Sequence, residues 1–203
     1  GGEPNGHPPV MLPEVIDRTT LPQIEAVLRD SINFPPDARQ LARQIDSDYI
    51  SRLLDLFDGL EADLPADKTA STRSLLHSLY SVFRSLVLLD SPTILRELIG
   101  AEEVAVRVAG VFEHEPTPDP DAQPPSYRAH LAGLGRFRQI VPVRSPSLLA
   151  LIHQTFRAQY FKDVILPRVL DDDAFALLAT MIRGNHVEII MGLEEEGELY
   201  SHL

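Results

Sequence analysis

The fold is decided by a leucine-rich stretch near the middle of the chain, Ser71 to Leu89, which reads STRSLLHSLYSVFRSLVLL. Its apolar residues recur at the spacing of an α-helix and cover more than one stripe of that helix. They are Leu75, Leu76, Leu79, Tyr80, Val82, Phe83, Leu86, Val87 and Leu88. A helix with so wide an apolar surface has to be covered on several sides. We therefore expect it to be the inner helix of a layer.

The segment before this stretch predicts three more helices. Asp46 to Ala62 carries a single apolar stripe. The stripe consists of Tyr49, Ile50, Leu53, Leu54, Phe57 and Leu60. Leu21 to Ser31 and Pro36 to Ile45 are two shorter helices, and Pro35-Pro36 opens the second because a proline at the first helical position loses no hydrogen bond.

Two serine–proline pairs mark helix starts after the stretch. Ser91-Pro92 and Ser145-Pro146 each place a hydroxyl cap before a proline at the first helical position. Gly100 is expected to end the first of these helices. Between Ala101 and Phe112 the valines also fit the alternation of a strand, but we interpret the segment as a helix.

The region after Ser145 predicts one helix that runs to Pro167. Its apolar residues are Leu148, Leu149, Ile152, Phe156, Tyr160, Val164 and Ile165. Asp171 to Asp173 are interpreted as the acidic start of a helix over Ala174 to Ile182, because consecutive residues on a helix point in different directions and make a poor metal or acid–base cluster. We expect Gly184-Asn185 to break the chain before a last pair of short helical stretches.

These elements predict an all-α protein. Eight to ten helices joined by short turns, in hairpin-sized units of about 40 residues, are typical of an irregular armadillo/HEAT-like helical repeat array. Because the repeat period is weak, a compact helical bundle stays open as a second architecture. We expect a disordered or cloning-derived leader over residues 1–20 and one armadillo-like domain over residues 21–203, with a proline-rich loop at residues 114–126.

Composition argues against several classes of function. The 203 residues carry a net charge of -12, which opposes non-specific attraction to nucleic acid or to an anionic membrane. There is no cysteine, and no apolar run approaches the roughly 18 to 20 residues of a membrane-spanning helix. The phosphate-binding, dinucleotide-binding, nucleophile-elbow and zinc-protease motifs do not occur, and the seven histidines lack ligand spacing. We expect no enzyme activity, no cofactor and no metal.

Charge is separated along the chain. Residues 128–168 hold seven basic residues and one acidic residue, Asp163, so the segment carries +6 and the rest of the chain sums to -18. The basic residues are Arg128, Arg136, Arg138, Arg144, Arg157, Lys162 and Arg168. We interpret this basic segment as a candidate contact surface for acidic groups. A second interpretation is that its cations pair internally with Asp171 to Asp173 or Glu194 to Glu196.

One stretch of the sequence resembles a known family. IHQTFRAQYFKDVILPRVLDDDAF, Ile152 to Phe175, is similar to the signature of the conserved helical domain in regulatory subunit 3 of protein phosphatase 4, the SMEK/Falafel family. Further similar stretches follow the family in the same order, so the resemblance covers roughly Leu21 to Leu203. They are YISRLLDLFDGLEAD at 49–63, LLHSLYSVFRSLVLLDSPTIL at 75–95, FEHEP at 112–116 and FRQIVPV at 137–143.

The resemblance implies a non-catalytic scaffold or targeting domain of a serine/threonine phosphatase regulatory subunit. Its implied partners are the protein phosphatase 4 catalytic subunit and regulatory subunit 2, bound directly or indirectly, together with substrate or adaptor proteins. The implied location is the nucleus and the cytoplasm, with no membrane partner. The alternative is a helical module that binds nucleic acid or another acidic ligand through the basic segment.

Candidate partner-binding residues lie on the predicted helix through IHQTFRAQY and in the segment before it. They are His153, Gln154, Arg157, Gln159, Lys162, Arg136 and Arg138. The helical period places Ile152, Phe156 and Tyr160 on the buried stripe, whereas Gln154, Arg157 and Lys162 leave that stripe. A second interpretation is that the polar residues of this helix hydrogen-bond backbone groups of neighbouring helices and fix the stacking.

Overall fold

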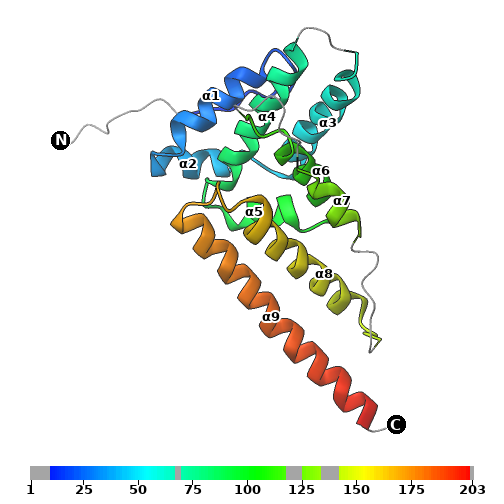
Figure 1. Cartoon of the computed structure of the whole chain (residues 1–203). Helices are drawn as coiled ribbons and strands as arrows, with labels where there is room; N and C mark the ends of the chain where they lie inside the picture. The colour runs from blue at the N-terminus through cyan, green and yellow to red at the C-terminus, as the bar shows by residue number, and fades with distance from the viewer. Residues whose placement is uncertain (1–9, 67–69, 118–124, 134–141, 202–203) are drawn as a thin grey trace, which may run out of the picture. The chain divides into compact units, whose positions relative to one another are not determined.

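The structure is a computed structural model that describes residues 10–66, 70–117, 125–133 and 142–201 (Figure 1). Every regular element among these residues is helical, which confirms the all-α class. The elements are α1 (Leu21–Ser31), α2 (Pro35–Ala42), α3 (Ser47–Asp63), α4 (Ser71–Val87), α5 (Pro92–Ile99), α6 (Glu102–Phe112), α7 (Tyr127–Ala132), α8 (Pro146–Tyr160), the π-helix η2 (Phe161–Ile165) and α9 (Asp172–Ser201).

The chain divides into two compact units, one ending at Ile94 and the other beginning at Leu95. In the first unit, α1 packs on α4 and α2, and α3 packs on α4. The expected inner helix is therefore confirmed as α4, which has neighbours on more than one side. Its buried residues are Thr72, Leu76, Leu79, Tyr80, Val82, Phe83, Ser85, Leu86 and Val87.

Side-chain caps mark where two of the helices, α3 and α5, begin. The Asp46 carboxylate accepts a hydrogen bond from the backbone N–H of Tyr49 at 2.8 Å and caps α3. The Ser91 hydroxyl accepts from the backbone N–H of Ile94 at 3.4 Å at the start of α5. The Ser91 cap follows the sequence signal, because a cap requires residues only three positions apart.

Part of the expected leader packs on this unit. The Gln44 side chain accepts a hydrogen bond from the backbone N–H of Leu12 at 3.0 Å and donates one to the carbonyl of Val10 at 2.9 Å. The Leu12 side chain is buried, and the Arg52 guanidinium donates to the carbonyl of Glu14 at 2.6 Å. Residues 10–20 therefore belong to the folded unit. The single domain over residues 21–203 stays a prediction.

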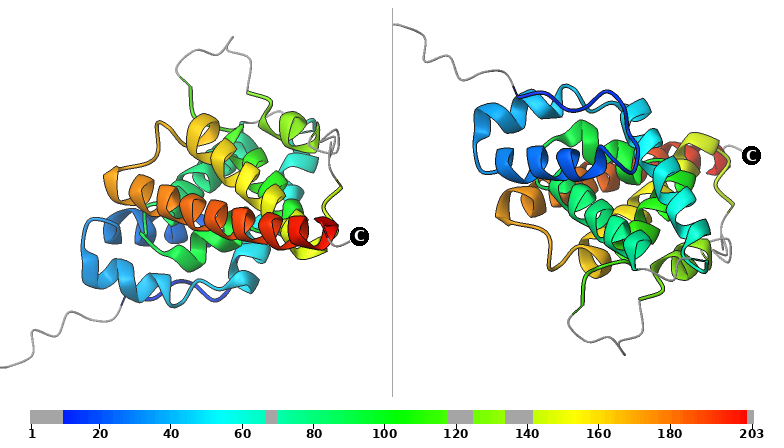
Figure 2. Two further views of the ribbon diagram at one scale, coloured as in Figure 1. Left: turned by 90° about the horizontal axis from the view of Figure 1, so that it is seen from below. Right: turned by 90° about the horizontal axis from the view of Figure 1, so that it is seen from above.

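In the second unit, α8 and α9 lie side by side, and α6 packs on α7 (Figure 2). The less exposed residues of α9 recur every three or four positions, as in a helical seam. Among them Leu178 and Ile182 are buried, and Asn185, Ile189 and Gly192 are half-buried. At one end of the seam Gly192 lies directly against the Leu148 side chain of α8.

The expected break at Gly184-Asn185 was wrong, because α9 is one helix of 30 residues that passes through both positions. A glycine inside a helix costs only about 1 kcal/mol relative to alanine, and unlike proline it keeps its backbone hydrogen bond. Packing against α8 outweighs that cost. The expected short helical stretches after Gly184 are parts of this helix.

The expected single helix from Ser145 to Pro167 was wrong in its last turn. The α-helix α8 ends at Tyr160, and η2 continues as a π-helix in which the backbone N–H of Leu166 donates to the carbonyl of Phe161 at 2.8 Å. The middle of the expected proline-rich loop lies outside the described residues, and residues 115–117 and 125–126 on either side of it are not helical.

We predict that Gly184→Ala raises the free energy of unfolding by about 0.5 to 1 kcal/mol, because a Cβ at this helical position meets no heavy atom within 4 Å. Gly192→Ala is the matched comparison, and its gain should be smaller or absent, since the new Cβ would lie 2.9 Å from a methyl group of Leu148. Urea unfolding measures both. A loss of stability in Gly184→Ala would contradict a continuous α9.

Candidate functional site

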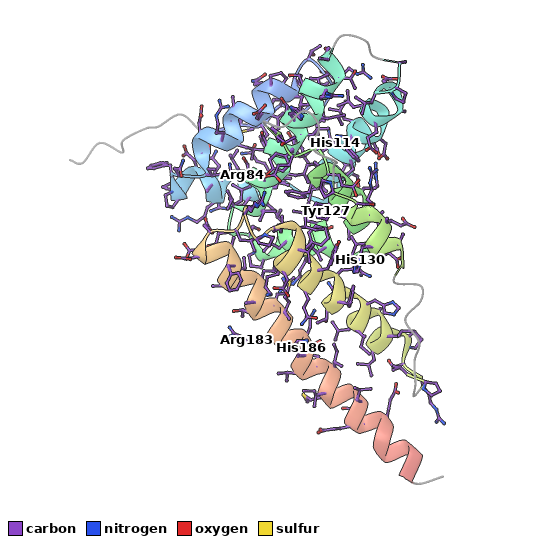
Figure 3. All side chains as sticks on the ribbon, in the orientation of Figure 1. Arg84, His114, Tyr127, His130, Arg183 and His186 are labelled. Atoms are coloured by element: carbon purple, nitrogen blue, oxygen red, sulfur yellow. The ribbon has the colours of Figure 1, made fainter. Side chains whose placement is uncertain are left out.

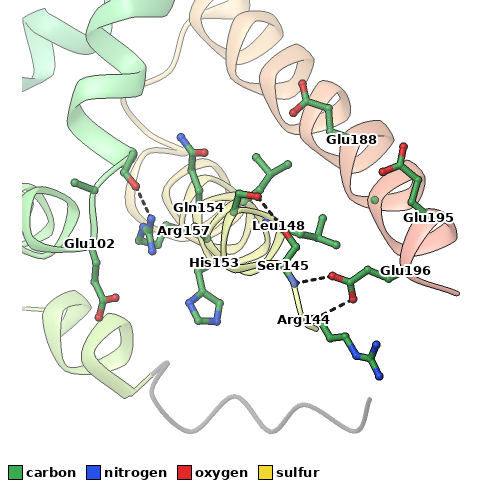
Figure 4. A pocket seen from close by; sticks show the side chains of 16 residues that line it. Glu102, Arg144, Ser145, Leu148, His153, Gln154, Arg157, Glu188, Glu195 and Glu196 are labelled. Carbon is green, nitrogen blue, oxygen red and sulfur yellow. Dashed lines mark hydrogen bonds between the residues drawn. The ribbon is translucent and has the colours of Figure 1, made fainter. Parts of the chain in front are cut away.

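A groove of about 1090 Å³ lies in the second unit (Figure 4). Its floor is the face of α8 that carries Ser147, Ala150 and Gln154. One wall is the turn between α5 and α6, with Gly100 and Glu102, and the other wall is α9. The α9 residues that line the groove are Glu188, Gly192, Glu195 and Glu196. The groove therefore joins segments almost a hundred residues apart in sequence.

The start of α8 is fixed to α9 by a carboxylate. The Glu196 side chain accepts hydrogen bonds from the backbone N–H of Arg144 at 3.1 Å and of Ser145 at 2.7 Å. The Ser145 hydroxyl in turn accepts from the backbone N–H of Leu148 at 3.3 Å and caps α8, as the sequence predicted. A negative charge is favourable here because the amino end of a helix carries a partial positive charge.

The far end of the groove is fixed by Arg157. Its side chain is only 5% exposed, and its guanidinium donates from Nε to the carbonyl of Ile99 at 3.2 Å and from Nη2 to the carbonyl of Gly100. Burial lowers the pKa of Arg157 below its ordinary value, while the negative charge of Glu102 acts in the opposite direction. The arginine therefore closes the carboxyl end of α5 and links it to α8.

The turn at Gly100 needs a glycine because the backbone is crowded. A Cβ at this position would lie 2.5 Å from the carbonyl oxygen of Arg96 and 3.4 Å from Nε2 of Gln154. The backbone N–H of Gly100 also donates to that Arg96 carbonyl at 2.7 Å. The expected helix end at Gly100 is confirmed, and the close approach brings the carbonyl of Gly100 within reach of Arg157.

The expected buried stripe of α8 was wrong. Phe156 is 39% exposed, and Ile152 and Tyr160 are only half-buried. Thr155, Arg157 and Ala158 are buried instead. The period of α8 was correct, but the side of α8 that becomes buried depends on α9 and on the α5–α6 turn, whose positions the local pattern does not contain.

The other candidate residues are scattered around α8. His153 and Gln154 line the groove and are half-buried, whereas Gln159 is half-buried outside the groove lining. Lys162 pairs with Asp163 and lies 5.3 Å from the ring centre of Phe175. Two further candidates, Arg136 and Arg138, lie outside the described residues. The structure thus brings together His153, Gln154 and Arg157, with Arg157 already engaged by carbonyl oxygens.

The basic segment also contributes contacts beside α8. The Arg128 guanidinium pairs with the Glu113 carboxylate at 2.7 Å. The same carboxylate accepts a hydrogen bond from the backbone N–H of Arg128 at 2.8 Å. The rings of His130 and Tyr160 stack with centres 4.5 Å apart, and Figure 3 shows His130 on α7. Burial raises the pKa of Tyr160 above its ordinary value. These contacts attach α7 to α6 and α8.

Comparison with known proteins assigns the chain to a family. The family described as phosphatase 4 regulatory subunit 3 matches residues 23–203. The chain belongs to this family. Suppressor of Mek1 from Dictyostelium discoideum is 35% identical over 156 residues, which cover 77% of this chain and 14% of that protein. Serine/threonine-protein phosphatase 4 regulatory subunit 3 from Drosophila melanogaster is 33% identical over 193 residues, which cover 93% of this chain and 18% of that protein.

The chain spans less than a fifth of the length of these two relatives of the phosphatase 4 regulatory subunit 3 family. No solved structure matches it significantly. In the part of this family member that the structure describes, no group of three or more histidine and carboxylate side chains is placed to hold a metal ion. No described helix is both long enough and apolar enough to cross a membrane.

The candidate binding residues predicted from the sequence did not include the acidic residues of the groove. Glu102 comes from α6, and Glu188 and Glu195 come from α9. The only local signal was the spacing of seven between Glu188 and Glu195, which places both on one side of a continuous helix. The expected break at Gly184-Asn185 concealed that signal, because it divided α9 into short pieces.

We predict that Arg157→Glu lowers the free energy of unfolding by about 2 kcal/mol or more, because it places an anion among carbonyl oxygens and near Glu102. Arg183→Glu makes the same charge change at an exposed position of α9 and should stay within about 0.5 kcal/mol of the parent chain. Chemical unfolding compares the two. Unchanged stability in Arg157→Glu would contradict the structural role of the arginine.

Proposed function

We propose that this chain is a non-catalytic, armadillo-like scaffold or targeting domain of a protein phosphatase 4 regulatory subunit. It would recruit substrates, adaptor proteins or the other phosphatase subunits, and it would act in the nucleus and the cytoplasm. The observation that carries the proposal is the family match over residues 23–203. The groove on the second unit supports it, because a scaffold needs a surface that a partner can enter.

The residues that line the groove favour recognition over catalysis. Arg157 is held by two carbonyl oxygens, and the Glu196 carboxylate is held by two backbone N–H groups. Asp171 lies outside the groove lining; it accepts a hydrogen bond from the backbone N–H of Ala174 at 2.8 Å and serves as a helix cap. Each of these charged groups has a structural partner, which supports a binding role.

The alternative of an acidic ligand on the basic segment is less favoured. Arg128 pairs with Glu113, Lys162 pairs with Asp163, and Arg157 is buried. A cation that is already paired gains little from a second anion, because its first partner must be displaced. Strongly salt-dependent binding of the chain to duplex DNA would nevertheless support this alternative.

The proposal predicts that the immobilised chain retains the purified phosphatase 4 catalytic subunit or regulatory subunit 2 when each is presented separately. An immobilised unrelated helical protein serves as the control for non-specific retention. The chain alone should not hydrolyse a phosphoserine peptide, whereas the catalytic subunit should. Retention of neither subunit would contradict subunit recruitment by this chain, and hydrolysis by the chain alone would contradict the non-catalytic role.

A further inference from the structure

The two walls of the groove carry negative charge that the structure leaves available. Glu102 on one wall, and Glu188 and Glu195 on the other, have exposed side chains (Figure 4). Among the described residues, no cation lies within ion-pair distance of Glu188 or Glu195. Glu188 and Glu195 are seven positions apart on one helix, so they lie about 10 Å apart along the groove.

The positive charges of the groove do not neutralise these walls. The Arg157 guanidinium is buried at the floor and is satisfied by the carbonyls of Ile99 and Gly100. Arg144 lies at the other end, where the Glu196 carboxylate binds its backbone N–H. Among the residues that the structure describes, the lining holds four glutamates and two arginines. A cationic ligand is therefore the electrostatic complement of this groove.

The floor of the groove is suited to a narrow, partly apolar ligand. Ala150 is exposed and has a small side chain, and Leu148 and Leu151 add apolar surface beside Gly192. From Ser147 to Arg157 the helix rises by roughly 15 Å. That length accommodates about four or five residues of an extended peptide. The volume of about 1090 Å³ slightly exceeds the range of about 300 to 1,000 Å³ that is usual for small-molecule pockets, which leaves room for a peptide.

We propose that this groove binds a short basic segment of a partner protein. Arginine or lysine side chains of the segment would pair with Glu188 and Glu195, and an apolar side chain would rest on Ala150 and Leu151. This inference rests on the proposed function, since it names the chemistry of a partner that the scaffold recruits. A second copy of this chain is a poorer occupant, because each copy carries a net charge of -12.

The first test selects random peptides for binding to the whole chain. A phage-displayed library of random heptapeptides, selected on the immobilised chain, should become enriched in arginine and lysine. Ala150→Trp fills the floor of the groove and should abolish the enrichment. Ala176→Trp makes the same change at an exposed position of α9 outside the groove and should preserve it. Circular dichroism of both variants establishes that they are folded.

The second test measures charge recognition with the most enriched peptide, labelled for fluorescence anisotropy. Glu188→Gln and Glu195→Gln should each weaken binding about threefold, as expected for exposed ion pairs. Glu194→Gln removes the same charge from an exposed position of α9 that does not line the groove, and it should leave the affinity unchanged. Added salt should weaken binding to the parent chain more than binding to the double glutamine variant.

Several outcomes would overturn the inference. These are the absence of enrichment, enrichment in acidic residues, equal binding to Ala150→Trp, or an equal loss in Glu194→Gln. Concentration-dependent dimerisation that Ala150→Trp abolishes would identify a second copy as the occupant instead. If the Ala150→Trp variant retains a phosphatase subunit and the parent chain binds no basic peptide, the proposed function stands. The proposal that the groove binds a basic segment is then refuted. If the parent chain binds a basic peptide but retains neither subunit, the groove proposal stands and subunit recruitment is contradicted.

Discussion

The groove depends on the hydrogen bonds between the Arg157 guanidinium and the carbonyls of Ile99 and Gly100. The cation lies at the carboxyl end of α5, where the aligned peptide dipoles leave a partial negative charge. It thereby attaches the last turn of α8 to the α5–α6 turn, while Glu196 attaches the start of α8 to α9. Hydrogen bonds at the two ends of α8, one set made by Arg157 and the other by Glu196 of α9, thus fix the distance between the walls.

These contacts change how the charge separation along the sequence is interpreted. A segment of +6 within an acidic chain suggested a basic contact surface, but several of its cations have partners inside the second unit. The charge that remains available at the groove belongs to glutamates on α6 and α9. The electrostatic character of the candidate site is therefore opposite to that of the segment that forms its floor.

A groove of this kind is consistent with a regulatory role in the phosphatase 4 regulatory subunit 3 family. Its charged groups at both ends are engaged in hydrogen bonds that stabilise the helices, so they are fixed in position before a partner arrives. Preorganisation lowers the entropic cost of binding. The small residues of the floor, Ala150 and Gly192, leave the space that a partner would occupy.

The sequence by itself determined the all-α class, the inner position of α4 and most helix ends, because a cap or an apolar stripe depends on residues within a few positions. It also indicated His153 and Gln154 as candidate binding residues; both line the groove, and their role in binding stays a prediction. Only the tertiary structure decided which side of α8 is buried, that α9 is continuous, and that its glutamates face the α5–α6 turn. Arg157 and Ile99 lie 58 positions apart, and Ser145 and Glu196 lie 51 apart. Contacts at such separations depend on how the helices pack, and a local pattern does not contain that information.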